Sequence, residues 1–534
     1  MTWQQSYDPL HGPLSTVAAA FPIVVLLGLL ALRRVPAYVA ALMGLATSLT
    51  VAIVIIGMPS PMAARASLYG AAYGFLPIGW IVLNVMFLYR LTEARGVFAT
   101  LQHAITGVTT DRRLQLLLIA FCFGAFFEGA AGFGTPVAVT GAMLIGLGFP
   151  PFEASALSLI ANTAPVAFGA LGTPIIALQG VSGLDLRQLS AMVGRQLPFF
   201  SALIPFWLMT AYSGWKGMLE IWPALLVAGV TFAIPQFLVS NYHGPWLVDI
   251  IAAACSMVCL SLYLRWKNIG TVKERRPIPA GGLPLSKALI PWAILTVIVF
   301  AWGTPQVKTF LNGISGPNIP IAGLDKMIFR MPPVLTKPTA EPAVFALNWL
   351  SASGTAILIT AVISGLMLGY SAKDLVREYG KAIRMTWRSL LTISAMMALG
   401  YVTRYSGADA IMGLAFAHTG VMYPFFAAML GWLGVALTGS DTSANVLFGS
   451  LQRLTAERLM LNPVLMAAAN SSGGVMGKMI DAQSICVASA ATGWVGHEWK
   501  ILRFVFWHSI GLAALVGLLT LAQQYLMPWM IVGH

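Results

Sequence analysis

Residues 128–138 read EGAAGFGTPVA, a polar and glycine-rich stretch with apolar sequence on both sides. The sequence LQLLLIAFCFGAFF precedes it and VTGAMLIGLGF follows it. In lipid, exposed backbone N–H and C=O groups cost several kcal/mol each, so irregular backbone within an apolar region must line a cavity or be buried in protein. The stretch therefore predicts a break inside a membrane-embedded segment, next to a cavity.

The composition of the whole chain indicates a membrane protein. Of its 534 residues 58% are hydrophobic and 9% charged, and the mean hydropathy is +0.80. A soluble protein carries roughly a quarter charged residues, and an apolar run of about 20 residues crosses the bilayer as a helix. Apolar runs fall near 14–33, 35–57, 66–90, 153–179, 188–210, 219–238, 245–266, 287–303, 343–369, 385–403, 461–490 and 504–529. We expect an all-α polytopic membrane protein with about 12 spanning helices.

The basic residues predict how the chain is oriented. The net charge is +13, but the charges gather in short loops between apolar runs, which is the positive-inside pattern and does not indicate a nucleic-acid partner. These loops contain Arg33, Arg34, Arg90, Arg95, Arg112, Arg113, Lys267, Lys273, Arg275, Arg276, Lys373, Arg377, Lys381, Arg384, Lys500 and Arg503. With all of them inside, the N-terminus lies outside and 267–286 is a cytoplasmic linker.

That orientation requires the two interrupted apolar regions, 114–147 and 420–460, to be re-entrant hairpins. Counted from the basic loops, they enter from opposite sides, as in an inverted-topology repeat. A similar stretch follows each hairpin: ANTAPVAFGALGTPI at 161–175 and ANSSGGVMGKMIDAQSI at 469–485, which are offset by 308 residues. Within the hairpins, Gly129 matches Gly439 at an offset of 310 residues. We therefore expect two repeat halves, 1–266 and 287–534.

Four polar breaks are predicted, at 128–136, 162–165, 438–445 and 470–474. Where a half-helix begins, its free N–H groups present a positive dipole end, so two such ends that meet form a site for a small anion. The alternative is a set of kinked helices packed closely through small residues.

Ionisable residues at these breaks are functional candidates, because a charge at the bilayer centre is costly. Lys478 could pair an anionic substrate, or form an internal salt bridge to Asp441 or Asp481. Glu128 and Asp441 are rival proton carriers, since burial favours a protonated carboxyl, and Asp481 is a further candidate or the partner of Lys478. Arg195 could attract an anion, or could reach to the interface. Other candidate binding residues are Gly134, Thr135, Asn162, Ser443, Asn445, Asn470 and Gln483.

The sequence offers little support for catalysis, metal binding or cofactors. The stretch GGVMGKM (473–479) lacks the first glycine and the Ser/Thr of a phosphate-binding loop. No His/Cys cluster has metal-ligand spacing, and no nucleophile–base pair can be placed. We expect a protein that is not an enzyme and that needs no metal or cofactor.

Several long motifs together resemble the L-lactate permease family. They are FCFGAFFEGAAGFGTPVAVTGAMLIGLGF, NTAPVAFGALGTPI, VGRQLPF, RMPPV, GWLGVALTGSDTSANVLFGSLQ and GKMIDAQSI, and the resemblance extends from WQQSYDP (3–9) to the last apolar run. Thr135 and Asp481 depart from the family pattern, in which a small apolar residue and a serine are common at these positions.

The resemblance implies proton-coupled import of L-lactate, D-lactate and glycolate across the inner membrane. The partners would be a small monocarboxylate, a proton and the lipid bilayer. Two other functions stay open on the sequence alone: a sodium-coupled di- or tricarboxylate carrier, and an anion channel. Substrate ranking, stoichiometry, oligomeric state and the type of motion are not encoded in any readable pattern.

Overall fold

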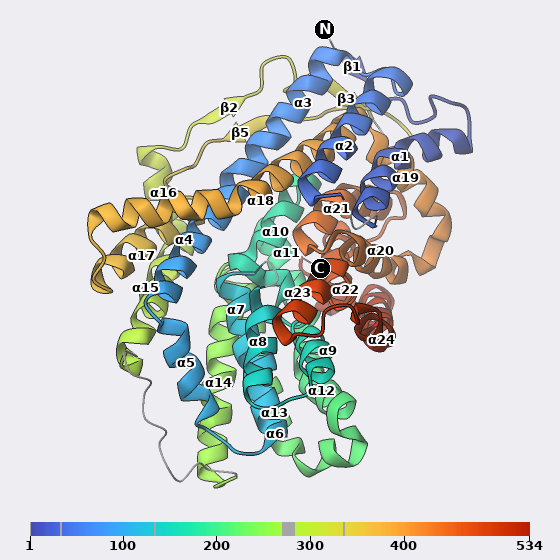
Figure 1. Cartoon of the computed structure of the whole chain (residues 1–534). Coiled ribbons are helices and arrows are strands. Elements are labelled where there is room, and N and C mark those ends of the chain that lie inside the picture. Colours follow the sequence, from blue (N-terminus) through green and yellow to red (C-terminus); the bar gives the residue numbers. More distant parts are fainter. Residues whose placement is uncertain (1, 32–34, 133–134, 270–282, 335–336, 534) are drawn as a thin grey trace.

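Helices dominate the structure, as the apolar runs predicted (Figure 1). The structure is a computed structural model that describes residues 2–31, 35–132, 135–269, 283–334 and 337–533. The first fourteen α-helices are α1 (Pro13–Ala31), α2 (Ala37–Thr50), α3 (Ser60–Tyr73), α4 (Trp80–Ala94), α5 (Val97–Thr106), α6 (Arg112–Leu116), α7 (Gly124–Ala130), α8 (Thr135–Gly146), α9 (Pro151–Ala161), α10 (Gly169–Ser182), α11 (Leu186–Val193), α12 (Leu197–Glu220), α13 (Trp222–Tyr242) and α14 (Val248–Trp266).

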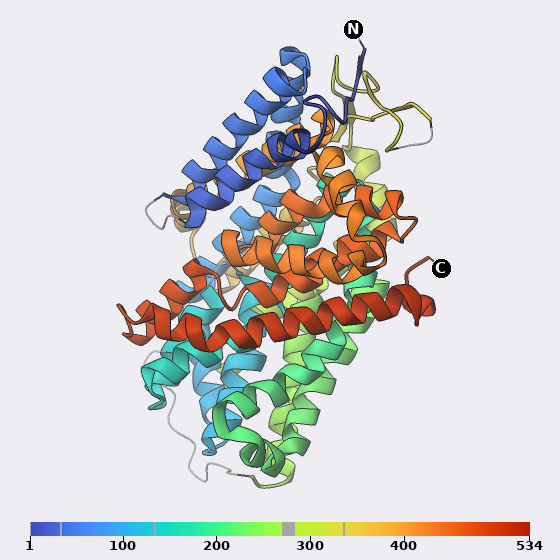
Figure 2. The same ribbon diagram turned by 90° about the vertical axis from the view of Figure 1, so that its right-hand side faces the viewer.

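The second part of the chain adds ten more α-helices. They are α15 (Leu285–Gly303), α16 (Pro305–Ile314), α17 (Ser353–Met367), α18 (Ala372–Ser406), α19 (Ala408–Phe416), α20 (Tyr423–Thr438), α21 (Asp441–Arg458), α22 (Pro463–Gly477), α23 (Ala482–Thr492) and α24 (Glu498–Tyr525). Most of the predicted linker 267–286 lies outside the described residues. In Figure 2, α24 (red) runs across the molecule.

Short π-helical and 3-10 segments join or extend these helices, and five short strands were not predicted. The helical segments are η1 (Val51–Ile55), η2 (Gly74–Gly79), η3 (Leu117–Phe123), η4 (Val166–Phe168), η5 (Ala417–Met422) and η6 (Pro528–Met530). The strands are β1 (Trp3–Gln4), β2 (Asn318–Pro320), β3 (Ile328–Arg330), β4 (Thr339–Ala340) and β5 (Val344–Ala346). They form one sheet of order β1-β3-β4 and one β2-β5 pair.

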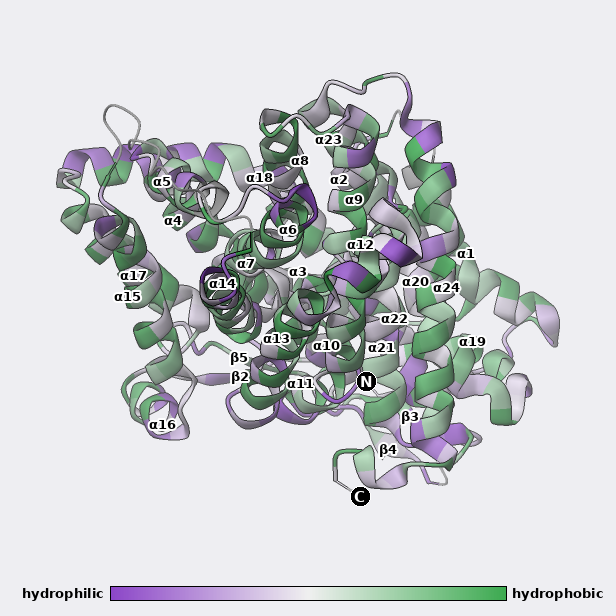
Figure 3. Ribbon diagram, turned by 90° about the horizontal axis from the view of Figure 1, so that it is seen from below, coloured by the Kyte–Doolittle hydropathy of each residue, from purple (hydrophilic) through white to green (hydrophobic). Residues whose placement is uncertain are grey.

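The helices have the length and surface that a membrane requires. Within the described residues nine helical stretches are long and apolar enough to span a bilayer, or ten when the bent pair Pro151–Ala161 and Val166–Ser182 counts as one span. The expected number of 12 is therefore not reproduced. Figure 3 shows hydrophobic residues along most of the helices, and side chains such as Val54 (75% exposed) and Leu68 (70%) face outward. Such an outer surface suits lipid contact.

Both predicted hairpins contain a helix break at their tip. In the first, α7 ends at Ala130 and α8 packs back against η3 and α7, so the chain reverses between these two helices; residues 133 and 134 lie outside the described part of the chain. In the second, α20 ends at Thr438, Gly439 adopts a left-handed conformation (φ 73°), and Ser440 caps α21. This second break is narrower than the predicted 438–445, because Asp441–Asn445 already belong to α21.

The third predicted break is present and longer than expected. Helix α9 ends at Ala161, and the axis bends by 65° before the rest of α10. Ala170, Leu171 and Gly172 all have positive φ (42°, 56° and 79°), so regular helix resumes only at about Thr173. The predicted 162–165 thus extends to residue 172.

The fourth predicted break, at 470–474, is wrong. Helix α22 continues through it to Gly477, and the chain turns only at 478–481. The glycines serve close packing instead: a Cβ at Gly473 would lie 2.1 Å from the Ala428 carbonyl oxygen, and one at Gly477 would lie 2.4 Å from that of Trp432. Small residues at a helix interface let the backbones of α20 and α22 approach closely.

Helix positions recur at a nearly constant spacing. Helices α3 and α18 begin at Ser60 and Ala372, and α9 and α22 begin at Pro151 and Pro463, so both pairs are 312 residues apart. This spacing is close to the 308–310 seen in the sequence. The division into repeat halves stays a prediction, and the helix positions agree with it.

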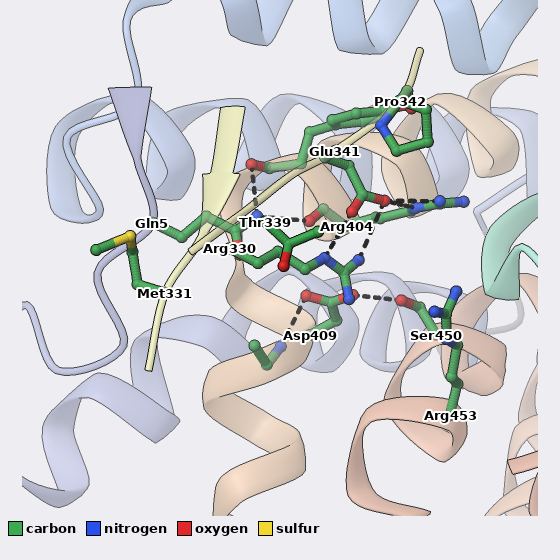
Figure 4. A network of polar contacts seen from close by, with 12 residues as sticks. Gln5, Arg330, Met331, Thr339, Glu341, Pro342, Arg404, Asp409, Ser450 and Arg453 are labelled. Atoms are coloured by element: carbon green, nitrogen blue, oxygen red, sulfur yellow. Dashed lines mark hydrogen bonds and ion pairs between the residues drawn. The ribbon is translucent and has the colours of Figure 1, made fainter. Parts of the chain in front are cut away.

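A buried cluster of charges holds the segment that contains β2–β5, residues 315–352, against the helices (Figure 4). Glu341 forms ion pairs with Arg404 (2.6 Å) and Arg330 (2.8 Å), and all three side chains are at most 10% exposed. Arg404 also donates to the carbonyl oxygens of Gly180 and Val181 near the end of α10. Burial acts to raise the pKa of Glu341, but the two guanidinium groups lower it below its usual value.

Glu341→Gln is expected to lower stability by about 3–5 kcal/mol, since removing one member of a buried ion pair leaves the other uncompensated. Thermal unfolding of the purified protein in detergent measures this effect. Because the folded-state pKa of Glu341 is lowered, its contribution is complete above the unfolded value of about 4.3 and is lost as pH falls through the folded value. Lys381→Ala is the control, because the Lys381 side chain is 48% exposed in its pair with Glu378 and should contribute at most about 1 kcal/mol. Equal effects of both variants would contradict the prediction.

Candidate functional site

The helix breaks surround one cavity of about 250 Å³. It lies between the two hairpin tips, the bend before α10, the start of α2 and the middle of α18. Its lining residues are Pro36, Ala37, Tyr38, Glu128, Gly132, Val166, Gly169, Ala170, Thr173, Pro174, Arg388, Ser389, Thr392, Ile393, Thr438, Gly439, Ser440, Asp441, Thr442, Ser443, Lys478 and Gln483. Pockets for drug-sized ligands span about 300–1,000 Å³, so this cavity suits a small molecule.

Glu128 enters the cavity from α7 and is 5% exposed. Its Oε2 accepts a hydrogen bond of 3.2 Å from Asn162 Nδ2, which lies just after α9. Gly169 borders the carboxyl so closely that a Cβ there would lie 2.7 Å from Oε1. The first and third breaks are thus joined at this carboxyl, which has one hydrogen-bond donor among the described residues.

Asp441 is the first residue of α21 and has a different environment. Its Oδ2 accepts hydrogen bonds from Ser471 (2.6 Å) and Asn445 (3.1 Å), while its Oδ1 has no partner among the described residues. Asn445 also donates to the Pro174 carbonyl oxygen and accepts from Asn470. These bonds join α21 to α22 and to α10, so Asp441 lies at a structural junction as well as in the cavity wall.

Lys478 follows α22 and places its ammonium group at the cavity. Its Nζ donates to the carbonyl oxygen of Gly439 (2.5 Å) and pairs with Asp481 (3.3 Å), and the residue is 6% exposed. The Gly439 carbonyl belongs to the end of α20, where a helix favours a cation. Asp481 also caps α23 by accepting from the Ser484 N–H at 2.7 Å. The salt bridge to Asp481, one of the alternatives drawn from the sequence, is therefore formed.

Two helix starts line the same cavity. Residues 440–443 begin α21, and Thr173 and Pro174 begin the regular part of α10. Free N–H groups at a helix start bind anions. The N–H groups at the start of α21 and the ammonium of Lys478 can both contact a small carboxylate, whereas Pro174 at the start of regular α10 has no N–H to donate.

The cavity brings together some of the predicted residues and leaves others apart. The predicted residues that line it are Glu128, Asp441, Ser443, Lys478 and Gln483. Asn162, Asn445 and Asp481 bond to lining residues (Glu128, Asp441 and Lys478, respectively), and Asn470 donates to Asn445. Arg195 is elsewhere, where it donates to the Asn241 side chain and the Met530 carbonyl. Gly134 and the side chain of Thr135 lie outside the described part of the chain.

The sequence reasoning missed the contribution of α18. Arg388, Ser389 and Thr392 line the cavity from this helix, and the Arg388 guanidinium lies 6.0 Å from the Tyr38 ring centroid. Positions 388 and 392 are one helical turn apart, so a polar stripe within the apolar run 385–403 could have revealed them. Ser471, the donor to Asp441, lies in the polar stretch 470–474, which the sequence predicts to be a break. No other sequence pattern points to this serine.

Within the described residues, no three His, Cys, Asp or Glu side chains are grouped to hold a metal ion. The groups that face the cavity are an ammonium, a guanidinium, two carboxyls and several hydroxyls. Such a set can bind a small anion with hydroxyl groups, and can take up and release a proton.

Broken helices around a polar cavity, together with an outer surface suited to lipid, define a multi-pass membrane protein with an internal polar cavity. The model of the L-lactate permease family matches residues 15–527. The glycolate permease GlcA of Escherichia coli K12 is 45% identical over 100% of both chains. The L-lactate permeases of the same strain and of Bacillus subtilis 168 are 42% and 43% identical, over 99% of this chain and 99% and 100% of theirs. The chain belongs to the L-lactate permease family.

Two solved structures show a more distant similarity. The YdaH transporter of Alcanivorax borkumensis aligns with a TM-score of 0.45 and 12% identity, over 87% of this chain and 88% of that one. The efflux pump MtrF of Neisseria gonorrhoeae aligns with a TM-score of 0.44 and 13% identity, over 86% and 83%.

Proposed function

We propose that this protein is a secondary active transporter that imports 2-hydroxymonocarboxylates, namely lactate and glycolate, together with protons. The observation that carries the proposal is the cavity between the two hairpin tips, which holds Lys478 and the buried carboxyl of Glu128. Family membership and the names of the relatives support the substrate class.

Each group in the cavity has a role in this proposal. Lys478 Nζ and the N–H groups at the start of α21 hold the substrate carboxylate. Ser443 and Gln483, with Thr173 from α10, are placed to hydrogen-bond the 2-hydroxyl. Glu128 carries the proton, because its carboxyl faces the cavity with Asn162 as its hydrogen-bond donor. Asp441 instead joins α21 to α22 through its bond from Ser471, and its other donor, Asn445, bonds to α10.

The proposed architecture follows the orientation inferred from the basic loops. The N-terminus lies outside, hairpins α6–α8 and α20–α21 enter from opposite sides, and the two repeat halves, 1–266 and 287–534, flank the cavity. Alternating exposure of a site between inverted repeats is a common means of transport.

Proton flux in liposomes tests the function. Purified protein is reconstituted with an internal pH dye, and lactate, glycolate or citrate is added outside without a pH gradient. Lactate and glycolate should each acidify the interior, citrate should not, and replacing Na⁺ by choline should change nothing.

Two rival functions predict other outcomes. A sodium-coupled di- or tricarboxylate carrier would respond to citrate and lose activity in choline. An anion channel would not accumulate lactate against its gradient when only a pH gradient is imposed. Either outcome would overturn the proposal.

A further inference from the structure

Asp249 is a buried acid that the cavity analysis does not use. It lies in the first turn of α14 and is 0% exposed. In the sequence it follows HGPWLV at the start of the apolar run 245–266, where an acid at a helix start has an ordinary structural interpretation. The structure gives that position a different setting.

The start of α14 packs directly against two of the helix breaks. A Cβ at Gly129 would lie 2.8 Å from Asp249 Cβ, and one at Gly172 would lie 2.7 Å from Pro245 Cβ. Gly129 is the residue after Glu128, and Gly172 is the last left-handed residue before α10 resumes. Only glycine permits this close approach. As a result, the backbone around Asp249 lies directly against the backbone of α7 that carries Glu128.

Both carboxyl oxygens of Asp249 lack a hydrogen-bond partner among the described residues. The residue is therefore not a helix cap, since a cap accepts from the N–H groups of the first turn. On the elements packed against α14, the titratable side chains are Glu128 on α7, Cys122 on η3 and Tyr242 on α13, and α10 has none. Cys122 pairs with Ser256, and Tyr242 is 77% exposed.

An ionised carboxylate with no partner is very unfavourable in a protein interior, whereas a neutral acid is far less so. No described residue on these neighbouring elements supplies a positive charge to Asp249. Two nearby carboxyls that cannot both ionise behave as one coupled unit that holds a proton in common. Asp249 and Glu128 are the two carboxyls to which this applies, because Asp249 Cβ lies against Gly129, the residue next to Glu128, and neither Asp249 oxygen has a partner among the described residues.

We propose that Asp249 is a second proton-binding residue, which accepts a proton from Glu128 when Glu128 ionises beside the substrate. This inference rests on the proposed proton-coupled function. No hydrogen bond joins these two described carboxyls, so the transfer requires their side chains to rotate into contact. The O–H bond of one carboxyl then breaks as the other carboxylate accepts the proton, and the charge of the pair does not change. Glu128 then exchanges protons with the cavity. Asp249, which is not among the lining residues, holds the proton between transfers.

Asp249→Asn tests the inference, since asparagine keeps the size of the side chain but cannot bind the proton. In liposomes, lactate uptake driven by a pH gradient should fall at least about tenfold, the equivalent of one pKa unit. Exchange of external for internal lactate, which needs no net proton movement, should stay within about twofold of wild type. Glu93→Gln, at an exposed acid of α4, is the matched control and should change neither.

Unchanged pH-driven uptake in Asp249→Asn, with a wild-type dependence on pH, would overturn the inference and leave the proposed function intact. Wild-type liposomes that move no protons with lactate would instead overturn the proposed function. If Asp249→Asn does not fold, a hydrophobic carbodiimide, which reacts with protonated buried carboxyls, can be applied to the wild type. Mass spectrometry should then find Asp249 modified, and less so as pH rises; no modification at the pH of fastest uptake would contradict its role.

Discussion

Lys478→Ala is expected to reduce lactate uptake, measured per molecule of transporter in the membrane, to the level of cells that lack the transporter. Lys478 lines the cavity and the residue is 6% exposed, so the bond of its ammonium group to a substrate carboxylate would form away from bulk water. A hydrogen bond to a charged group contributes about 1.5–3 kcal/mol, which is roughly 10- to 150-fold in affinity. Uptake of labelled lactate at concentrations well below KM measures the loss.

The salt bridge to Asp481 requires a second variant. Removal of Lys478 alone leaves Asp481, which is 0% exposed, without its cation, and a buried pair broken in this way loses about 3–5 kcal/mol of stability. In the double variant Lys478→Ala with Asp481→Asn, the leftover charge is removed as well. If Lys478 binds substrate, the double variant is folded and inactive. Recovery of uptake in it would show that Lys478 only neutralises Asp481.

The sequence predicts the fold best where a physical rule is strict. Lipid excludes unpaired backbone, so polar and glycine-rich stretches in apolar runs had to be buried or line a cavity, and three of the four predicted breaks are present. The fourth prediction fails because a glycine in a membrane helix can either allow the chain to turn or allow two helices to pack closely. Gly473 and Gly477 permit close contact between α20 and α22, and their spacing alone does not separate close packing from a turn.

The site was only partly predictable, for a similar reason. Glu128, Asp441 and Lys478 are conspicuous because charge at membrane depth is costly. Arg388 is not conspicuous, because it follows a basic stretch and its position at the cavity depends on how α18 crosses the structure. Asp249 was missed because an acid at a helix start is unremarkable until the partner glycine, Gly129, is seen against it. Side-chain pairings such as Lys478 with Asp481 need coordinates.

Glu128→Gln is expected to abolish lactate uptake driven by a pH gradient and to preserve lactate exchange. Glutamine has nearly the same size, and its carbonyl oxygen can still accept from Asn162 Nδ2, which now donates to Glu128 at 3.2 Å. The cavity should therefore still bind lactate, while the group that carries the proton is gone. Both rates are measured in liposomes with labelled lactate, one with an imposed pH gradient and one with equal lactate and pH on both sides.

Asp441→Asn should behave differently, which separates the two carboxyls. Asp441 accepts from Ser471 and Asn445, and these bonds weaken by about half when the acceptor loses its charge. Because they join α21 to α22 at the cavity wall, exchange and pH-driven uptake should fall together, along with thermal stability. If Asp441→Asn instead lost only pH-driven uptake, and Glu128→Gln lost neither activity, the proton carrier would be Asp441, and the pairing of Glu128 with Asp249 would have no part in coupling.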